Sequence, residues 1–258
     1  VSVGGAKEFF ILMDEAKGQD YFQDYLKIAK SNRLYEKDKQ RGLILSDFLA
    51  DLHSVKKRSN SLYQRKLRDT IGSGQSIMGV LDSYPTKVNW LKKTEIEALV
   101  QKAVSFWAKD RFKKKRLCQV HGDFHPGNIW WKSKEDFVVL DRARGQWGEA
   151  ADDISSVLIN NIFLSLVFQN EFKGALKKLA DIFLSNYLQK TQDKDLMNVM
   201  PPYLAFRAVV VANPIFYSDD FYPKPEEASI KRKQMINFAL NILSTDSFEL
   251  DWVNNYFN

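Results

Sequence analysis

Apolar residues recur along the first half of the chain with the three- and four-residue spacing that places them on one face of a helix. The pattern is clear where Leu45, Phe48, Leu49 and Leu52 fall on one broad face. Turn-forming residues interrupt the pattern at intervals and separate one helix from the next. The spacing predicts helices over about residues 21–29, 36–54, 61–71, 75–83 and 92–111.

The apolar content is highest in the helix predicted over residues 153–168, where apolar side chains lie on nearly every face. A helix of this kind is buried, so it should form the centre of the molecule. Acidic residues at its start suit the positive end of the helix dipole. Further helices are predicted over residues 174–189, 196–212 and 226–243, and a short aromatic segment follows over residues 246–258.

Short apolar runs that are too brief for helices predict a small β element. Residues 117–120 and 137–140 are two such runs, and a polar loop lies between them. Residues 8–13 form a third run that is typical of a buried strand. The predicted fold class is therefore mainly α with a small β element (α+β).

Composition places the chain among globular proteins. It has 258 residues, enough for one or two domains, and 45% of them are apolar, which excludes a disordered chain. The net charge is +6, but 32 acidic residues are interspersed with 38 basic ones. We therefore predict a solvated surface and no nucleic-acid partner. The basic stretch over residues 109–116 is interpreted in the same way, as a solvated helix end.

The number of cysteines and the length of the apolar runs indicate where in the cell the protein is expected. Cys118 is the single cysteine, so no internal disulfide can form. No uninterrupted apolar run reaches the roughly 20 residues of a membrane span, and the N-terminus lacks the pattern of a secretory leader. These features predict a cytoplasmic protein without a membrane partner.

The candidate chemistry lies in the loop between the two predicted strands, over residues 121–128. Asp123 follows the first apolar run, Asn128 comes five residues later, and Asp141 ends the second run. A carboxylate in a loop that faces a cleft can accept a proton from a hydroxyl. Amide and carboxylate oxygens suit Mg²⁺, and Asp-x4-Asn followed by a strand-terminal Asp is the layout of a kinase catalytic loop. Pro126-Gly127 should turn the loop so that Asn128 lies beneath Asp123.

Other candidate motifs carry weaker signals. His53 ends a predicted helix, and a core or capping histidine is favoured there over a catalytic one. Gly72-Ser73-Gly74 has neither a preceding strand nor a following lysine, so a plain turn is favoured over a phosphate-binding loop. His121 and His125 do not form a convincing zinc pair, because the residues that follow deny them a helix.

The motif His121-Gly-Asp-Phe-His-Pro-Gly-Asn128 resembles the signature of the aminoglycoside phosphotransferase and choline kinase-like superfamily, which shares the protein-kinase fold. Three further segments are similar to those of that superfamily. Residues 49–53 resemble its helix end before the loop, residues 139–141 resemble its metal-binding strand, and Gly148 with Asp153 resembles its Gly-Asp-Pro-x-x-Asp segment. The resemblance covers roughly residues 8–165.

The resemblance implies a role for each motif residue. Asp123 would be the catalytic base or the residue that orients the substrate hydroxyl. Asn128 and Asp141 would be the Mg²⁺ ligands, while His121 and Asp153 would support the loop. ATP (or GTP) would be the co-substrate, and the second partner would be a small hydroxylated acceptor.

The resemblance also implies a division of the chain. Residues 1–18 would be the last strand of the N-lobe with its hinge, where Met13, Asp14 and Glu15 would contact adenine. Residues 19–258 would be the helical C-lobe. A kinase-like enzyme needs a glycine-rich loop, a strand lysine and a helix glutamate before the hinge, and too few residues precede it here. We therefore expect the N-lobe to be largely absent, the chain to be a truncated form, and the isolated chain to be inactive.

The acceptor and the departures from the family pattern leave alternatives open. Arg142 and Arg144 follow Asp141 where many relatives carry a second acid, and they could contact phosphate or lie on the surface. The acceptor is a small metabolite, a sugar or an antibiotic, although a net charge of +6 disfavours polycationic aminoglycosides. The alternative function is a non-catalytic pseudokinase-like binding or scaffold protein. Residues proposed to line the acceptor pocket are Trp130, Trp131, Trp147 and Asp152.

Overall fold

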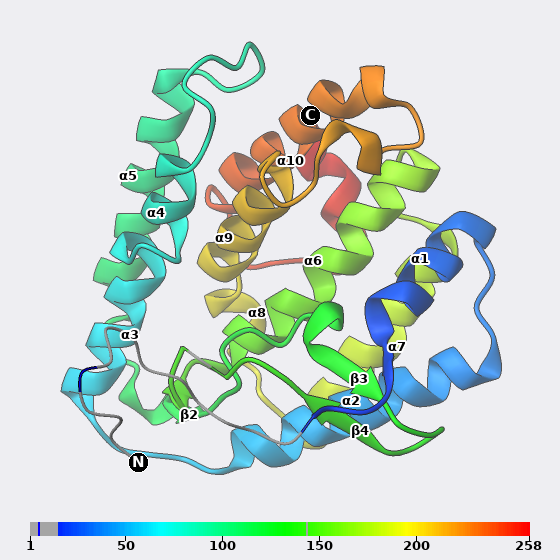
Figure 1. Cartoon of the computed structure of the whole chain (residues 1–258). Helices are drawn as coiled ribbons and strands as arrows, with labels where there is room; N and C mark the ends of the chain where they lie inside the picture. Colours follow the sequence, from blue (N-terminus) through cyan, green and yellow to red (C-terminus); the bar gives the residue numbers. More distant parts are fainter. Residues whose placement is uncertain (1–4, 6–14, 143) are drawn as a thin grey trace.

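The computed structural model describes residue 5, residues 15–142 and residues 144–258 of the chain. Helices dominate it, and two small sheets lie near the predicted loop (Figure 1). The α+β class predicted from the sequence is thus observed, while the strand predicted over residues 8–13 lies outside the described residues. The helices are α1 (Tyr21–Ser31), α2 (Glu36–Ser54), α3 (Asn60–Gly72), α4 (Ile77–Asp82), α5 (Lys93–Asp110), α6 (Ala150–Gln169), α7 (Gly174–Thr191), α8 (Leu196–Val199), α9 (Pro201–Ala212) and α10 (Ala228–Ile242).

The helix predicted over residues 196–212 is divided in two in the structure. α8 ends at Val199, and α9 begins at Pro201. Proline suits the first turn of a helix but cannot continue one, because it has no amide hydrogen and a fixed φ angle. The aromatic tail also takes up regular structure, as a 3-10 helix over Leu250–Phe257 that packs on α10.

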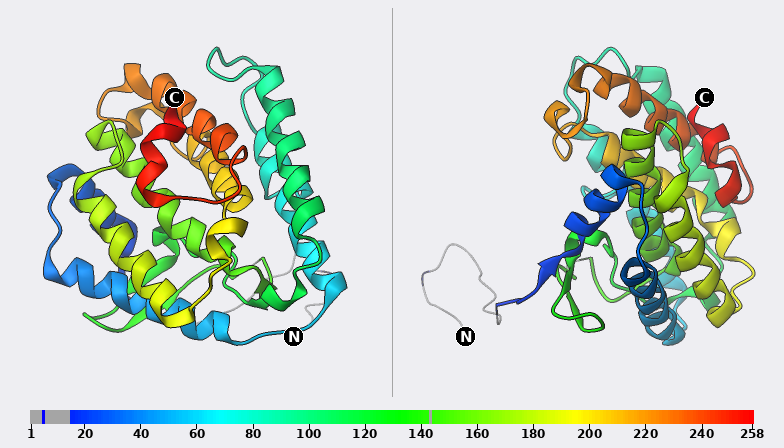
Figure 2. Two further views of the ribbon diagram at one scale, coloured as in Figure 1. Left: turned by 180° about the vertical axis from the view of Figure 1, so that it is seen from behind. Right: turned by 90° about the vertical axis from the view of Figure 1, so that its right-hand side faces the viewer.

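α6 lies at the centre of the molecule, as its apolar composition predicted. Figure 1 shows α3, α4 and α5 along one side and α1 and α7 along the other, with α6 and α9 between them, and the reverse view in Figure 2 agrees. α6 packs against α1, α7 and α9. By length and average composition α6 could cross a membrane, although polar residues interrupt its apolar runs, and 89% of its apolar window is buried within the fold.

The strands β1 (Gln19–Asp20), β3 (Ile129–Trp131) and β4 (Phe137–Val139) form an antiparallel sheet in the order β1-β3-β4. β2 (Cys118–Gln119) pairs with β5 (Trp147–Gly148) in a second antiparallel sheet. The first sheet holds the end of the predicted loop. The second sheet brings the entry to that loop beside the start of α6.

The basic stretch after α5 differs in one residue from the solvated surface predicted for it. The side chain of Arg116 is only 10% exposed, and its guanidinium pairs with Glu149 at 2.7 Å and with Asp193 at 2.7 Å. Burial disfavours the charge, but the two carboxylates outweigh it and raise the pKa of Arg116 above its ordinary value. Arg116 therefore fastens the start of α6 to the loop after α7.

Candidate active site

The loop over residues 121–128 is held from below by the first turn of α6. The fully buried carboxylate of Asp153 accepts hydrogen bonds from the backbone N–H groups of His121 and Gly122, both at 2.7 Å. It also lies 3.1 Å from Nε2 of His53. Burial opposes ionisation, but His53 and the two amides outweigh it and lower the pKa of Asp153. This placement fits the supporting role predicted for Asp153.

His53 is a core residue, as predicted, and it links three helices. Its Nδ1 lies 2.8 Å from the hydroxyl of Tyr187 on α7. Because a carboxylate can only accept, Nε2 carries the hydrogen toward Asp153, and Nδ1 accepts from the Tyr187 hydroxyl. The end of α2 is thereby joined to both α6 and α7. His121 supports the loop from inside, since its Nδ1 accepts from the backbone N–H of Asp123 at 3.2 Å.

Asp123 is paired with two arginines. Nη1 of Arg207 lies 2.5 Å from its Oδ1, and Nη2 of Arg144 lies 3.3 Å from its Oδ2. Burial opposes ionisation of the carboxyl, but Arg207 and then Arg144 outweigh it and lower the pKa of Asp123 below its ordinary value. Asp123 is therefore a carboxylate at neutral pH, fixed in position by two charge-assisted contacts.

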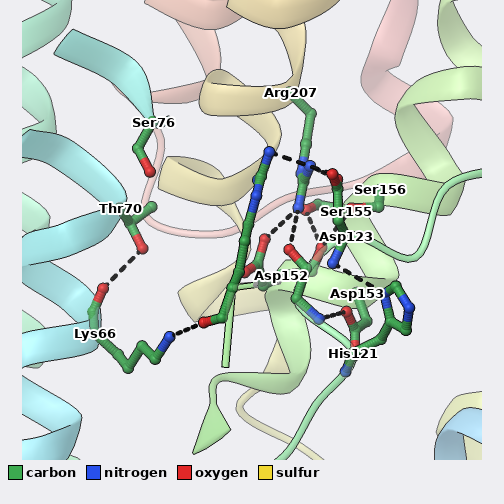
Figure 3. A network of polar contacts seen from close by, with 12 residues as sticks. Lys66, Thr70, Ser76, His121, Asp123, Asp152, Asp153, Ser155, Ser156 and Arg207 are labelled. Atoms are coloured by element: carbon green, nitrogen blue, oxygen red, sulfur yellow. Dashed lines mark hydrogen bonds and ion pairs between the residues drawn. The ribbon is translucent and has the colours of Figure 1, made fainter. Parts of the chain in front are cut away.

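Arg207 is the site residue that sequence reasoning missed. It extends from α9, is 4% exposed, and donates from Nη2 to Oδ1 of Asp152 at 2.6 Å and to the carbonyl oxygen of Gly122 at 3.1 Å. Figure 3 shows its guanidinium between Asp123 and Asp152. The two carboxylates outweigh burial and raise the pKa of Arg207. A signal was present in the sequence, because a single charge in the otherwise apolar helix Pro201–Ala212 needs a buried partner.

The carboxylate of Asp152 completes this network. Burial raises the pKa of Asp152 above its ordinary value, although Arg207 acts in the opposite direction. Its side chain is nevertheless 22% exposed and accepts the short bond from Arg207, so we treat it as ionised. Asp123, Arg207 and Asp152 thus form a carboxylate–guanidinium–carboxylate bridge from the loop through α9 to α6.

The two arginines after Asp141 have different positions. Arg142 donates from Nε and Nη2 to the carbonyl oxygen of Val120, at 3.1 and 2.9 Å, and so braces the entry to the loop. Arg144 reaches Asp123, and its guanidinium lies 5.4 Å from the ring centre of Phe206. Burial and the charge of Arg207 lower the pKa of Arg144. Of the two, Arg144 is therefore the one that reaches the carboxylate of Asp123.

Asn128 and Asp141 lie at the same end of the β3–β4 hairpin. The backbone N–H of Leu140 donates to the carbonyl oxygen of Asn128 at 2.8 Å, and Asp141 follows directly, exposed and with a φ of 57°. The 3-10 turn Pro126–Asn128 brings Asn128 back under the loop as expected, because its Nδ2 donates to the carbonyl oxygen of Asp123 at 3.0 Å.

This donor set suits a hard cation. Within the described ranges no three His, Cys, Asp or Glu side chains gather as a metal site. One amide oxygen and one carboxylate match the way Mg²⁺ is usually held, with phosphate oxygens and water completing the shell. The residues present therefore fit a magnesium ion that arrives with a nucleotide.

A cavity of about 550 Å³ opens beside Asp123. Apolar and polar residues both line it, and the polar ones include Gln75, Ser83, Ser156 and Asn160. His125 contributes too; its Nδ1 accepts from the backbone N–H of Gly127 at 3.2 Å, and burial lowers its pKa. The apolar and aromatic residues in the lining are Phe22, Val80, Ile159, Val210, Val211, Phe216 and Tyr217.

The remaining pocket predictions have mixed outcomes. Trp131 is buried in the core, 4.5 Å under the guanidinium of Arg41, so it was wrongly proposed as a pocket residue. Trp130 lines neither the cavity beside Asp123 nor the one next to it among the described residues. Asp152 and Trp147 line the neighbouring cavity.

The structure describes one of the three residues predicted to contact adenine. Met13 and Asp14 lie outside the described residues. Glu15 is described and exposed. The turn predicted at Gly72-Ser73-Gly74 is present at the end of α3.

Comparison with known proteins confirms the resemblance carried by the loop motif. The sequence profile of the phosphotransferase enzyme family matches residues 4–182. Glucosamine kinase in complex with glucosamine, ADP and inorganic phosphate is similar in fold, with a TM-score of 0.54 and 13% identity over 84% of this chain and 59% of that chain. Crystal form B of glucosamine kinase has a TM-score of 0.53 and 15% identity, over 87% of this chain and 59% of that chain.

A Plasmodium vivax ethanolamine kinase has a TM-score of 0.46 and 14% identity, over 98% of this chain and 65% of that chain. No curated protein matches the chain. At their identities the two glucosamine kinase structures show a shared fold and nothing finer. The chain spans about three fifths of the length of the glucosamine kinase chains.

Proposed function

The chain belongs to the phosphotransferase enzyme family, and from this premise we propose that it transfers the γ-phosphoryl group of ATP (or GTP) to a hydroxyl of a small molecule. The observation that carries the proposal is the position of Asp123. Its carboxylate is ionised, held by two guanidinium groups, and exposed to a cavity of a size that suits a small acceptor. A metabolite, a sugar or an antibiotic would be the acceptor.

Asp123 would orient the acceptor hydroxyl and receive its proton. Its lowered pKa makes it a weak base before the reaction begins. Phosphoryl transfer passes through a loose transition state in which positioning and electrostatics dominate, so a strong base is not required. We therefore assign Asp123 mainly to orientation, with proton acceptance as the oxygen becomes acidic on bonding to phosphorus. Arg207 would hold Asp123 in the orienting position.

Asn128 and Asp141 would hold Mg²⁺, with the amide oxygen Oδ1 of Asn128 and the carboxylate of Asp141 as ligands. When bound, the ion would neutralise charge on the nucleotide phosphates. The hairpin contact between Asn128 and Leu140 supports this assignment, because it keeps the two ligand positions at one end of β3 and β4.

The nucleotide base would lie at the segment before β1, where Met13, Asp14 and Glu15 would contact adenine. Residues 1–18 would then be the last N-lobe strand with its hinge, and residues 19–258 the helical lobe. Because the chain covers 59% of the glucosamine kinase chains, the activity is proposed for the protein encoded by the complete reading frame.

The direct test is incubation of that protein with γ-labelled ATP, Mg²⁺ and a panel of hydroxylated small molecules. The proposal predicts label on at least one acceptor, and no transfer when Mg²⁺ is removed with a chelator. A protein that binds Mg²⁺-nucleotide and transfers label to none of the neutral, cationic and anionic acceptors would contradict it.

A non-catalytic binding protein on the same fold is the second candidate, and one observation favours it. Both carboxylate oxygens of Asp123 are already paired with arginines, which is typical of a structural carboxylate as well as of a positioned one. The two candidates differ in turnover: a binding protein would retain nucleotide or small-molecule affinity without producing ADP.

A further inference from the structure

A second cavity, of about 470 Å³, lies next to the first. Arg144 and Gln75 line both cavities, so the guanidinium of Arg144 stands at the border between them. The second cavity is formed by α3, by the turn that follows it and by the loop before α6. It lies on the α3 side of Asp123, and the metal-ligand positions at the β3–β4 hairpin do not line it.

Lys66 is a partly buried cation that lines this cavity and not the first. It lies on α3, is half-buried, and donates from Nζ to the carbonyl oxygen of Arg144. In the part of the chain that the structure describes, no carboxylate lies within 4 Å of its ammonium group. A half-buried ammonium without a counter-charge is favourable only if an anion or water completes its surroundings.

The acids in the same cavity are already engaged. Asp152 accepts from Arg207, and Asp69 lies 3.5 Å from Arg65 on the rim. Arg144 shares Asp123 with Arg207 at the longer distance of 3.3 Å. Lys66 and Arg144 are therefore partly buried cations with donors to spare, while burial and the charge of Arg207 lower the pKa of Arg144.

Hydroxyl groups complete the lining. Thr70, Ser73 and Ser76 all face this cavity, and Figure 3 shows Lys66, Thr70 and Ser76 together on the α3 side of the Asp123 network. Thr70 donates its hydroxyl hydrogen to the carbonyl oxygen of Lys66 at 3.0 Å, and Ser73 donates to Oγ of Ser76 at 2.9 Å, so the hydroxyl hydrogen of Ser76 is the one that remains available to a ligand. Two cations with one nearby hydroxyl donor are suited to a carboxylate or a phosphate.

We propose that this second cavity binds an anionic group, a carboxylate or a phosphate, of the same acceptor whose hydroxyl lies at Asp123. The inference rests on the proposed function and names its substrate class: a small hydroxylated acid or a phosphorylated sugar or alcohol. Arg144 contacts Asp123 and also lines the second cavity. The hydroxyl and the anionic group of such an acceptor therefore need to be separated by little more than the width of one guanidinium group.

The same charges disfavour an amine acceptor. Of the acids that line either cavity, Asp123, Asp152 and Asp69 are paired with arginines. Asp20 is used as the N-cap of α1, accepting from the backbone N–H of Phe22 at 2.8 Å. A cationic substrate would therefore find, in these two cavities, only carboxylates that already have a partner.

The kinetic test compares a neutral hexose, the same hexose carrying a phosphate, and the corresponding hexuronic acid. We expect kcat/KM to be at least about 10-fold higher for one of the two anions, the size of one hydrogen bond to a charged group. Lys66→Met should reduce that preference by about 10-fold, and Lys66→Arg, which keeps the charge, should restore most of it. Lys93→Met, an exposed lysine on α5, is the control and should leave the preference unchanged.

A binding test does not need turnover. Titration of the protein with inorganic phosphate or acetate should show saturable binding that Lys66→Met weakens and Lys93→Met does not. If neutral hexose is phosphorylated and neither anion is preferred, the inference is overturned while the proposed function stands. If no acceptor is phosphorylated but Lys66-dependent anion binding persists, the anion site stands while the proposed function fails. Preference for phosphate or for carboxylate identifies which anion the site takes.

Discussion

Replacing Arg207 by methionine removes the buried cation that joins the loop to α6 while keeping an apolar side chain of similar length. Arg207 holds Asp123 at 2.5 Å, Asp152 at 2.6 Å and the carbonyl oxygen of Gly122 at 3.1 Å. Removing one partner of a buried ion pair leaves an uncompensated charge and costs about 3–5 kcal/mol. We expect Arg207→Met to lower the free energy of unfolding by that amount near pH 7.

The pH dependence of this loss has a definite sign. Arg207 lowers the pKa of Asp123, so the ion pair stabilises the folded protein above the ordinary carboxyl pKa. That stabilisation disappears as the pH falls through the lowered pKa of the folded state. The difference in unfolding free energy between wild type and Arg207→Met should therefore be largest near neutrality and shrink in acid.

Activity should respond in the same direction. Without Arg207 the pKa of Asp123 rises, so the acidic limb of the kcat profile should move to higher pH. The kcat at the optimum should also fall, because Arg144 alone holds the carboxylate, at 3.3 Å. Urea unfolding at several pH values and the pH profile of kcat measure the two effects.

Arg41→Met is the matched control. Arg41 pairs with Asp24 in a buried contact between α2 and α1, where the side chains are 7% and 3% exposed. Its removal should destabilise the fold by a similar amount. Arg41→Met should not move the acidic limb of the pH profile of kcat. An identical shift of that limb in both variants, or none in Arg207→Met, would refute the positioning role of Arg207.

Two further predictions concern residues around the loop. Asp141→Ala should abolish the Mg²⁺ dependence of nucleotide binding, measured by calorimetry with and without the ion, and an affinity that still rises with Mg²⁺ would exclude Asp141 as a ligand. Asp153→Asn should cost about 3 kcal/mol at pH 7, because a fully buried carboxylate that accepts from two backbone amides and His53 is lost. The cost should shrink in acid, since the pKa of Asp153 is lowered in the fold, and a pH-independent cost in urea unfolding would contradict this.

Local patterns predicted most of the helical framework. α2 occupies the residues expected from its apolar face, and α3 and α5 differ from expectation by one residue at each end. The split at Pro201 was missed because the apolar period continues across Met200, while the backbone cannot continue through proline. The spacing of apolar residues indicates which face of a helix is buried. It does not indicate where the backbone hydrogen bonds of the helix end.

The loop residues could be found from the sequence because their spacing is local. The Asp-x4-Asn motif and the strand-terminal Asp141 all lie within 20 residues, and the hairpin brings them to one end of a sheet. Arg207 could not be found in this way, since its partners come from a loop and a helix far away in the sequence. The same holds for Lys66 and for Arg116, whose partners are set by how α3, α6 and α7 pack.

The central claim is that phosphoryl transfer takes place at Asp123. Its most direct test is the rate of label transfer from γ-labelled ATP to the acceptor, measured for wild type, Asp123→Asn and the exposed control Asp51→Asn in the protein encoded by the complete reading frame. We predict that Asp123→Asn transfers label at least about 10²-fold more slowly, while its affinity for Mg²⁺-ATP and the rate of Asp51→Asn stay unchanged. An undiminished rate in Asp123→Asn would contradict the account.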